Sequence, residues 1–314
     1  MKIGMGIPET GPQATRAALA AWVARAEGLG FAHFTVSDHI VIPGAIGSTY
    51  PDSETGAVSG WGESVEQLTF MAYLAAITTS AQLVASVMVT PLRGAMHTAK
   101  TIATIDVLSE GRMVLGVGVG WLAEEFEAVQ APPFKERGRV TDEYLQAFKL
   151  LWTAENPSFH GDHVRFDNVI FEPKPVQKPH PPIWVGGESL PAMRRAVRHG
   201  DAWHPIDSNP RHRLDTLERV AGGIARLHRL AEDNDRDPAT IGVALYTGWS
   251  TTEERADDGQ RKMLTGAEAT IAEDIQALEA MGVSDLLLGF RRDTLEASLG
   301  NMQYFADDIW ALAK

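Results

Sequence analysis

We expect an α/β protein that folds as a (β/α)8 TIM barrel, one domain over residues 1–314, and three observations predict it. Short β-rich apolar runs alternate with longer stretches of helical period, which is typical of a parallel sheet covered by helices. Eight such strand and helix units follow one another from near the first residue to the last. No linker or low-complexity tract divides the chain, and 314 residues is an ordinary length for one barrel.

The eight predicted strands are short β-rich apolar runs. In chain order they cover residues 2–7, 31–39, 82–89, 113–120, 182–187, 202–206, 241–249 and 285–290. Helical spacing of Leu19, Trp22 and Val23 predicts the first helix, and similar stretches cover about 65–79 and 95–109. Thr265 and Glu268 have the spacing of a capping box, and Thr294 is expected to begin the last helix.

Three long loops interrupt this alternation, at residues 40–64, 154–181 and 250–264. The middle one contains "SFHGDHVRFDN", in which apolar and polar residues alternate about a Gly-Asp turn. We therefore expect a hairpin insertion before the fifth barrel strand. The loop 40–64 carries Tyr50 and Trp61 and is expected to close as a lid over a substrate.

Composition excludes several classes of function. The net charge of −13 disfavours binding to nucleic acid or to an anionic membrane surface. The absence of cysteine excludes disulfides, thiolate nucleophiles and cysteine metal sites, so redox chemistry requires a borrowed cofactor. The start "MKIGMGIPET" has no apolar stretch of signal-peptide length, and no later segment resembles a membrane span. We expect a cytoplasmic protein that acts on a small molecule.

The end of the fifth strand predicts a phosphate site, because barrel enzymes place their sites at the carboxyl ends of strands. Gly186 and Gly187 end this strand, and Ser189 has the place of a helix N-cap. Backbone amides at such a junction point at one spot, with the positive end of the helix dipole behind them. Glycine would let phosphate oxygens approach the backbone. The alternative is a plain tight turn.

His39 is the predicted catalytic residue. It follows Asp38 at the end of the second strand, where an imidazole can donate or accept a proton and Asp38 can orient it or bind a ligand. The alternative is a histidine held by packing. His160 and His163 lie on the predicted hairpin without a carboxylate at clear metal-ligand spacing, so no metal site is expected.

The run "GVGVGW" at residues 116–121 has Trp121 where a dinucleotide-binding fingerprint needs its third glycine. Glycines here are expected to let the strand and its loop pass close to a flat ligand. Aromatic residues at strand ends or in loops suit a cleft for a planar ring. The expected substrate pocket therefore includes Trp61, Trp121, Trp203 and Trp249. No lysine ends a predicted strand, which argues against a Schiff-base aldolase.

Six blocks in order resemble the luciferase-like monooxygenase family, and within it the branch that uses the deazaflavin coenzyme F420. They are "VSDHIVIP", "ASVMVTP", "LSEGRMVLGVGVGWLAEEFEA", "FKERGRVTDEYLQAFKLLW", "FEPKPVQKPHPPIWVGG" and "RHGDAWHP". The resemblance covers nearly the whole chain.

This resemblance implies a flavin-like ring at the strand ends, facing Asp38 and His39, with His39 as proton donor or acceptor. It implies that the cofactor phosphate lies on the backbone of Gly186, Gly187 and Glu188. It also implies a non-proline cis peptide at Ser86 and Val87, forming a bulge that supports the ring. Trp121 stands where sugar-phosphate dehydrogenases of this branch have a glutamate, so their substrate is not expected here.

The resulting prediction is an F420-dependent oxidoreductase that moves a hydride between the deazaflavin and a small organic substrate. One alternative is an FMNH2-dependent flavin monooxygenase of the same fold, and a second is a non-catalytic protein that carries a flavin or deazaflavin. The apolar helical surfaces within residues 65–109 are expected to pair in a homodimer.

Overall fold

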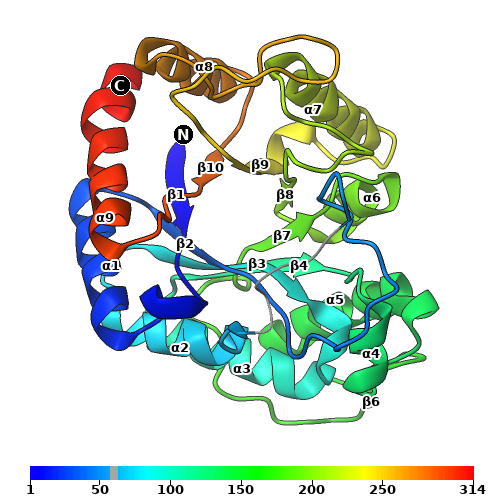
Figure 1. Cartoon of the computed structure of the whole chain (residues 1–314). Coiled ribbons are helices and arrows are strands. Elements are labelled where there is room, and N and C mark those ends of the chain that lie inside the picture. The colour runs from blue at the N-terminus through cyan, green and yellow to red at the C-terminus, as the bar shows by residue number, and fades with distance from the viewer. Residues whose placement is uncertain (57–62) are drawn as a thin grey trace.

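The computed structural model describes residues 1–56 and 63–314. Within them, eight parallel strands close into a barrel in the order β1-β10-β9-β8-β7-β4-β3-β2, which confirms the predicted fold class. Helices surround this barrel on the outside (Figure 1). The barrel strands are β1 (Lys2–Gly6), β2 (His33–Val36), β3 (Gln82–Val89), β4 (Met113–Gly118), β7 (Ile183–Gly186), β8 (Ala202–His204), β9 (Gly242–Thr247) and β10 (Asp285–Leu288).

Each barrel strand is followed by helical structure. The α-helices are α1 (Arg16–Leu29), α2 (Gln67–Ile77), α3 (Ala95–Leu108), α4 (Ala123–Ala128), α5 (Arg137–Thr153), α6 (Leu190–His199), α7 (Leu217–Glu232), α8 (Glu268–Ala280), α9 (Leu295–Tyr304) and α10 (Ala311–Ala313). Short 3-10 turns are η1 (Gly11–Gln13), η3 (Thr90–Leu92), η4 (Phe134–Glu136) and η5 (Pro238–Thr240), and η6 (Phe305–Trp310) is a π-helical stretch. The C-terminal helix α9 packs beside α1 (Figure 1).

The expected insertion before the fifth barrel strand is present. Strands β5 (Phe159–His160) and β6 (Arg165–Phe166) pair antiparallel, and His160 is opposite Arg165. Glu143 of α5 holds the turn, because its carboxylate accepts hydrogen bonds from the amides of Asp162, His163 and Val164. The two strands therefore form a small hairpin outside the barrel.

One predicted helix start is wrong. Helix α8 begins at Glu268, and its N-cap is Ala267, which makes no side-chain cap. Thr265 lies one turn earlier, where its hydroxyl donates to the Lys262 carbonyl and accepts from the Glu254 amide. Thr265 and Glu268 have the spacing of a capping box, but the Thr265 hydroxyl stabilises the loop before α8 and does not cap the helix. Thr294 does cap α9, by accepting from the Ala297 amide.

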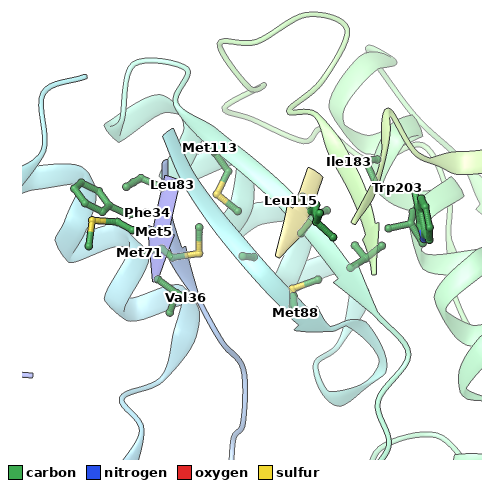
Figure 2. Close-up of a cluster of buried hydrophobic side chains, with 14 of the residues drawn as sticks. Met5, Phe34, Val36, Met71, Leu83, Met88, Met113, Leu115, Ile183 and Trp203 are labelled. Carbon is green, nitrogen blue, oxygen red and sulfur yellow. The ribbon is translucent and has the colours of Figure 1, made fainter. Parts of the chain in front are cut away.

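The core has two layers, because side chains of a strand alternate between the barrel interior and the helices. The outward layer is the larger, and Figure 2 shows part of it, including Met5, Phe34, Leu83 and Leu115 from neighbouring strands. The interior layer is a compact cluster of Val84, Val114, Trp184, Ala202, Ala244 and Leu287. It fills the middle of the barrel, so we expect the site at the strand ends.

Inward positions above that cluster are small on several strands. Following the alternation toward the carboxyl ends, they are Gly6, Thr35, Ser86, Gly116 and Gly186, with larger His204 and Tyr246 on the opposite side. These small residues make room for neighbouring groups: a Cβ added to Gly6 would lie 3.1 Å from the Tyr246 hydroxyl, and one added to Gly186 would lie 2.9 Å from Val87. The carboxyl ends of the strands, where barrel enzymes bind ligands, lie directly above this layer.

Candidate active site

His39 lies just beyond β2 and is bound by a carboxylate that sequence reasoning did not identify. Its Nδ1 is 2.9 Å from Oε2 of Glu125 on α4. The other oxygen of Glu125 accepts hydrogen bonds from the amides of Ile40, at 2.7 Å, and Val41, at 3.2 Å. Glu125 is 1% exposed. Because a carboxylate accepts, Nδ1 carries the proton, which makes Nε2 the ring atom that exchanges a proton when the imidazole acts as an acid or base.

Asp38 has a different role from the one predicted. Its side chain is fully enclosed and forms a bidentate ion pair with Arg93, at 2.7 and 2.8 Å. It also accepts from the Val89 amide at 2.8 Å. The interpretation that Asp38 orients His39 is therefore wrong, since Glu125 does so. The Asp38 carboxylate ties the end of β2 to the end of β3 and is not exposed to a ligand.

The end of β3 carries the bulge that the family resemblance implied. The peptide bond between Ser86 and Val87 is cis, and the register of β3 against β4 shifts between Ala85 and Met88. Pairing of Val36 with Ala85 places this bulge beside the end of β2, close to the loop that carries His39. The implied cis peptide is confirmed.

Glycines of β4 and β7 make room for this bulge. A Cβ added to Gly118 would lie 2.6 Å from Val87 Cγ2, and one added to Gly186 would lie 2.9 Å from Val87 Cγ1. A Cβ added to Gly116 would lie only 1.9 Å from the backbone oxygen of Ala85. The expectation that these glycines directly admit a ligand is therefore corrected. They admit the β3 bulge, which then presents Val87 at the mouth of the barrel.

His204 supports the same bulge from inside the barrel. Its Nδ1 donates to the Ala244 carbonyl at 2.6 Å, so Nε2 accepts from the Ser86 hydroxyl at 2.8 Å. Burial lowers the pKa of His204 to about 4. A neutral imidazole is required for this arrangement, because a protonated Nε2 could not accept the Ser86 bond.

The predicted phosphate seat has the geometry of a strand-to-helix turn. Gly187 has a φ of +100°, a conformation that favours glycine. Ser189 is the N-cap of α6 and accepts from the Ala192 amide at 3.4 Å. Among the described residues, no acceptor takes a hydrogen bond from the amides of Ser189 and Leu190. Two donors at a helix N-terminus are thus left for an anion.

The Glu188 side chain turns away from these amides toward the loop after β8. Its carboxylate accepts from the Ile206 amide at 2.9 Å and from Nδ2 of Asn209 at 2.8 Å. Burial, opposed by these hydrogen bonds, raises the pKa of Glu188 to about 7. The carboxyl is therefore held near the point where it exchanges a proton at neutral pH.

Two further groups at the mouth have raised pKa values. Burial raises the pKa of Tyr246 to about 12, with the charges of Glu9 and Asp207 adding to the shift. Burial also raises the pKa of Glu9, although Ser37 donates to its carboxylate through both the amide and the hydroxyl. The barrel mouth is thus a desolvated environment for charge.

Among the predicted pocket tryptophans that the structure describes, only Trp121 lies near His39. Its ring centroid lies 6.2 Å from that of His39 and 5.2 Å from that of Tyr50. Trp61 falls outside the described residues. A pocket role for Trp121 stays a prediction.

Trp203 and Trp249 are not placed beside His39 and pack in other parts of the fold. Trp203 is 1% exposed, donates from Nε1 to the Gly187 carbonyl at 2.9 Å, and belongs to the outward core layer (Figure 2). Trp249 packs on aromatic residues of the C-terminal region, with ring centroids 5.0 Å from Phe305 and 5.8 Å from Phe290. A strand-end position did not reveal which face of the sheet each ring would occupy.

The loop after β2 runs past α4 and on toward α6, as the blue trace in Figure 1 shows. Glu124, next to Glu125 on α4, accepts from the amides of Gly47, at 2.7 Å, and Ser48, at 3.0 Å. Farther along, Glu54 pairs with Arg213 in the loop after β8. The described part of the predicted lid is therefore fixed at both sides of the mouth.

No group of three or more potential metal ligands occurs among residues 1–56 and 63–314. His160 pairs with Asp167 at 3.5 Å, and His163 with Glu136 at 3.7 Å. No helix in the same residues is long and apolar enough to cross a membrane.

Sequence reasoning missed Glu125, although a signal was available. The pair Glu124 and Glu125 lies in the first turn of α4, where acidic residues suit the helix dipole. An acidic pair in this position is expected on the surface, so nothing in the sequence indicates that Glu125 is buried. The loop that Glu125 binds lies about 85 residues earlier in the chain. Only the folded barrel brings α4 against the end of β2.

A model of the luciferase-like monooxygenase family matches residues 1–298. The FMNH(2)-dependent dimethylsulfone monooxygenase of Pseudomonas putida is 31% identical over 289 residues, which cover 78% of this chain and 79% of that protein.

Solved structures share the fold at low sequence identity. An F420-dependent secondary alcohol dehydrogenase in complex with an F420-acetone adduct has a TM-score of 0.75 and 16% identity, with all of both chains covered. The oxygenating constituent of 3,6-diketocamphane monooxygenase from Pseudomonas putida, in complex with FMN, has a TM-score of 0.72 and 15% identity, with 98% of each chain covered. The chain is therefore an oxidoreductase that belongs to the luciferase-like monooxygenase family.

Proposed function

We propose that this oxidoreductase moves a hydride between the deazaflavin coenzyme F420 and a small organic substrate. The observation that carries the proposal is the His39 and Glu125 pair at the barrel mouth. A buried carboxylate fixes Nδ1 of His39, and the adjacent bulge presents Val87 to the same opening. Such a pair supplies a positioned proton donor or acceptor without a metal or a thiol.

The residues present fit a flavin-type cofactor. Donors for a phosphate are available at Ser189 and Leu190, whose amides have no acceptor in the described chain. The apolar Val87, which the β3 bulge presents at the mouth of the barrel, suits the face of a flat ring. We propose that the backbone of Gly186, Gly187 and Glu188 completes the phosphate seat.

When bound, the deazaflavin supplies a carbon that accepts or donates a hydride. The chain supplies the proton chemistry. Nε2 of neutral His39 takes a proton from a substrate hydroxyl, and the imidazolium that forms is stabilised by Glu125, which is 2.9 Å from Nδ1. In the reverse direction the same atom returns the proton. We propose that Trp121, whose ring centroid lies 6.2 Å from that of His39, shields this side of the site from water.

A second candidate is an FMNH2-dependent monooxygenase, which the relative in Pseudomonas putida favours by its name and its 31% identity. The two candidates differ in cofactor and in the need for oxygen. Anaerobic titration with F420 and with FMN, followed by fluorescence, measures which cofactor binds more tightly. Turnover of alcohols or unsaturated carbonyls without oxygen then supports hydride transfer, and turnover that needs oxygen contradicts it.

Replacing His39 tests its role and separates an enzyme from a cofactor carrier. His39→Ala should lower turnover by about 10²- to 10⁴-fold, with little change in cofactor affinity. The matched control is His160→Ala in the exposed hairpin, which should leave turnover unchanged. Unchanged turnover of His39→Ala removes this residue from the mechanism. Cofactor binding by the wild-type protein with no turnover of any substrate favours a carrier.

We also propose that the protein acts as a homodimer through the α2 and α3 side of the barrel. Val65, Met96, Val107 and Leu108 are exposed apolar residues of this region. Sedimentation at several concentrations measures the assembly. A single monomeric species throughout the range would contradict this proposal.

A further inference from the structure

A cationic groove follows the proposed phosphate seat on the outside of the barrel. It has a volume of about 230 Å³ and is lined by Asp142 of α5 and by Pro191, Arg194, Arg195 and Arg198 of α6. These two helices are neighbours (Figure 1). The α6 residues are spaced three and four apart, so they share one face of the helix.

The groove carries two positive charges that the described chain does not neutralise. Arg195 is 7% exposed, pairs with Asp142 and donates to the Gly138 carbonyl at 3.0 Å, so its charge is compensated. Arg194 and Arg198 are exposed. Within residues 1–56 and 63–314, neither has a carboxylate within 4.0 Å or donates a hydrogen bond. In a chain of net charge −13, such a site selects anions.

The position of the groove indicates what kind of anion it takes. Helix α6 begins at Leu190, directly after the proposed phosphate seat. A helix rises about 1.5 Å per residue, so Arg194 and Arg198 lie about 6 and about 12 Å along the axis from Leu190. An anionic chain attached to the seated phosphate would pass these two guanidinium groups in turn. A ligand that ends at its phosphate has no further anionic group to place beside Arg198.

A second cleft of about 230 Å³, beside α7, is less suitable although it also contains arginines. Arg213 and Arg219 there are already bound by four carboxylates, those of Glu54, Asp215, Asp257 and Asp258. Their positive charge is neutralised within the protein, so Arg226 is the one arginine of this cleft with no carboxylate within 4.0 Å among the described residues. The groove on α6 has two such arginines and is therefore the better anion site.

We propose that the groove of Arg194 and Arg198 binds the chain of carboxylates that a deazaflavin coenzyme carries beyond its phosphate. FMN ends at the phosphate and has no group for this groove. The inference rests on the proposed F420-dependent function and deepens it, because it assigns residues that distinguish one cofactor from the other. The binding is non-covalent and adds no step to the reaction.

Two forms of the deazaflavin coenzyme test the groove, one without glutamate and one with several glutamates. Their dissociation constants are measured by fluorescence titration, independently of turnover. The longer form should bind the wild-type protein about threefold to tenfold more tightly, as expected for exposed ion pairs. The gain should vanish at about 1 M salt, where the Debye length falls to about 3 Å.

The double variant Arg194→Gln/Arg198→Gln should bind both forms with the affinity that the wild-type protein has for the form without glutamate. Arg229→Gln, which removes an exposed arginine of α7, is the matched control and should keep the gain. Thermal melting checks that each variant is folded, and single substitutions replace the double variant if it is not. The proposed role of the groove is wrong if the wild-type protein binds both forms with equal affinity. It is also wrong if the gain persists in Arg194→Gln/Arg198→Gln.

The two proposals fail differently in this experiment. If the form without glutamate does not bind, F420 is not the cofactor. The proposed function and the proposed role of the groove are then both wrong. If that form binds and added glutamates change nothing, only the groove is wrong.

Discussion

Substituting Gly186 by alanine tests whether the glycines of the barrel mouth exist to admit Val87. The new Cβ would lie 2.9 Å from Val87 Cγ1, about 0.5 Å closer than ordinary contact begins, at about 3.4 Å. Valine is stiff at χ1, so the methyl cannot simply rotate away. Overpacking of this kind costs about 1–3 kcal/mol of the free energy of unfolding. Alanine also restricts the unfolded backbone more than glycine does, which offsets about 0.4–1 kcal/mol of this destabilisation.

Val87→Ala provides the decisive second substitution, because it removes the methyl groups that Gly186→Ala would meet. The double variant should be more stable than the sum of the single effects predicts, by about 1 kcal/mol. Gly116→Ala should behave differently. Its Cβ would lie 1.9 Å from the Ala85 backbone oxygen, which no side-chain truncation removes, so its cost should be larger and Val87→Ala should not relieve it.

Urea unfolding monitored by circular dichroism measures these differences, provided that refolding is shown to be reversible. Gly222→Ala on α7 is the control, because its Cβ meets no atom within 4 Å and should stabilise the protein by up to about 1 kcal/mol. Additive effects of Gly186→Ala and Val87→Ala would refute the reasoning. So would a Gly116→Ala variant as stable as Gly186→Ala.

Three further substitutions address the polar groups. Glu125→Gln should lower turnover by about 10- to 100-fold, because His39 loses its anionic partner. Pre-steady-state kinetics should show the loss in the chemical step and not in substrate binding. Asp38→Asn should cost about 1.5–3 kcal/mol in urea unfolding, because Arg93 loses the charge of one of its two carboxylate partners and keeps only Glu66, at 2.7 Å; a cost below about 0.5 kcal/mol would contradict the assigned ion pair. Burial raises the pKa of Glu188 from 4.5 to about 7, so the folded state holds the proton more tightly, and this group's contribution to stability falls as pH rises from about 4.5 to about 7. Glu188→Gln should abolish this loss of unfolding free energy, which amounts to up to about 3 kcal/mol. Identical profiles of stability against pH for the variant and the wild-type protein would contradict the raised pKa of Glu188.

The barrel was predictable because its signals are local and repeated. Each strand is a short apolar run, and eight units in a row left few other topologies. The Ser189 and Thr294 caps were predictable for the same reason, because each bonds an amide three residues on. Thr265 had a similar pattern, and its hydroxyl bonds elsewhere because two partners in the preceding loop compete for it.

The site was less predictable because its decisive contacts join distant segments. The Glu125 carboxylate and the His39 imidazole lie 86 residues apart, and the hollow for Val87 is formed by glycines of two other strands. Asp38 and Trp203 were misassigned because a strand-end residue can face a ligand, a neighbouring strand or a helix. Pairing, register and the bulge decide among these, and a single sequence does not specify them.

Locating the phosphate of a bound cofactor tests the central claim most directly. A crystal structure of the protein with F420 should show the phosphate against the backbone of residues 186–190 and the ring over Val87, within reach of Nε2 of His39. A phosphate bound elsewhere, or a ring on another face of the barrel, would contradict the account.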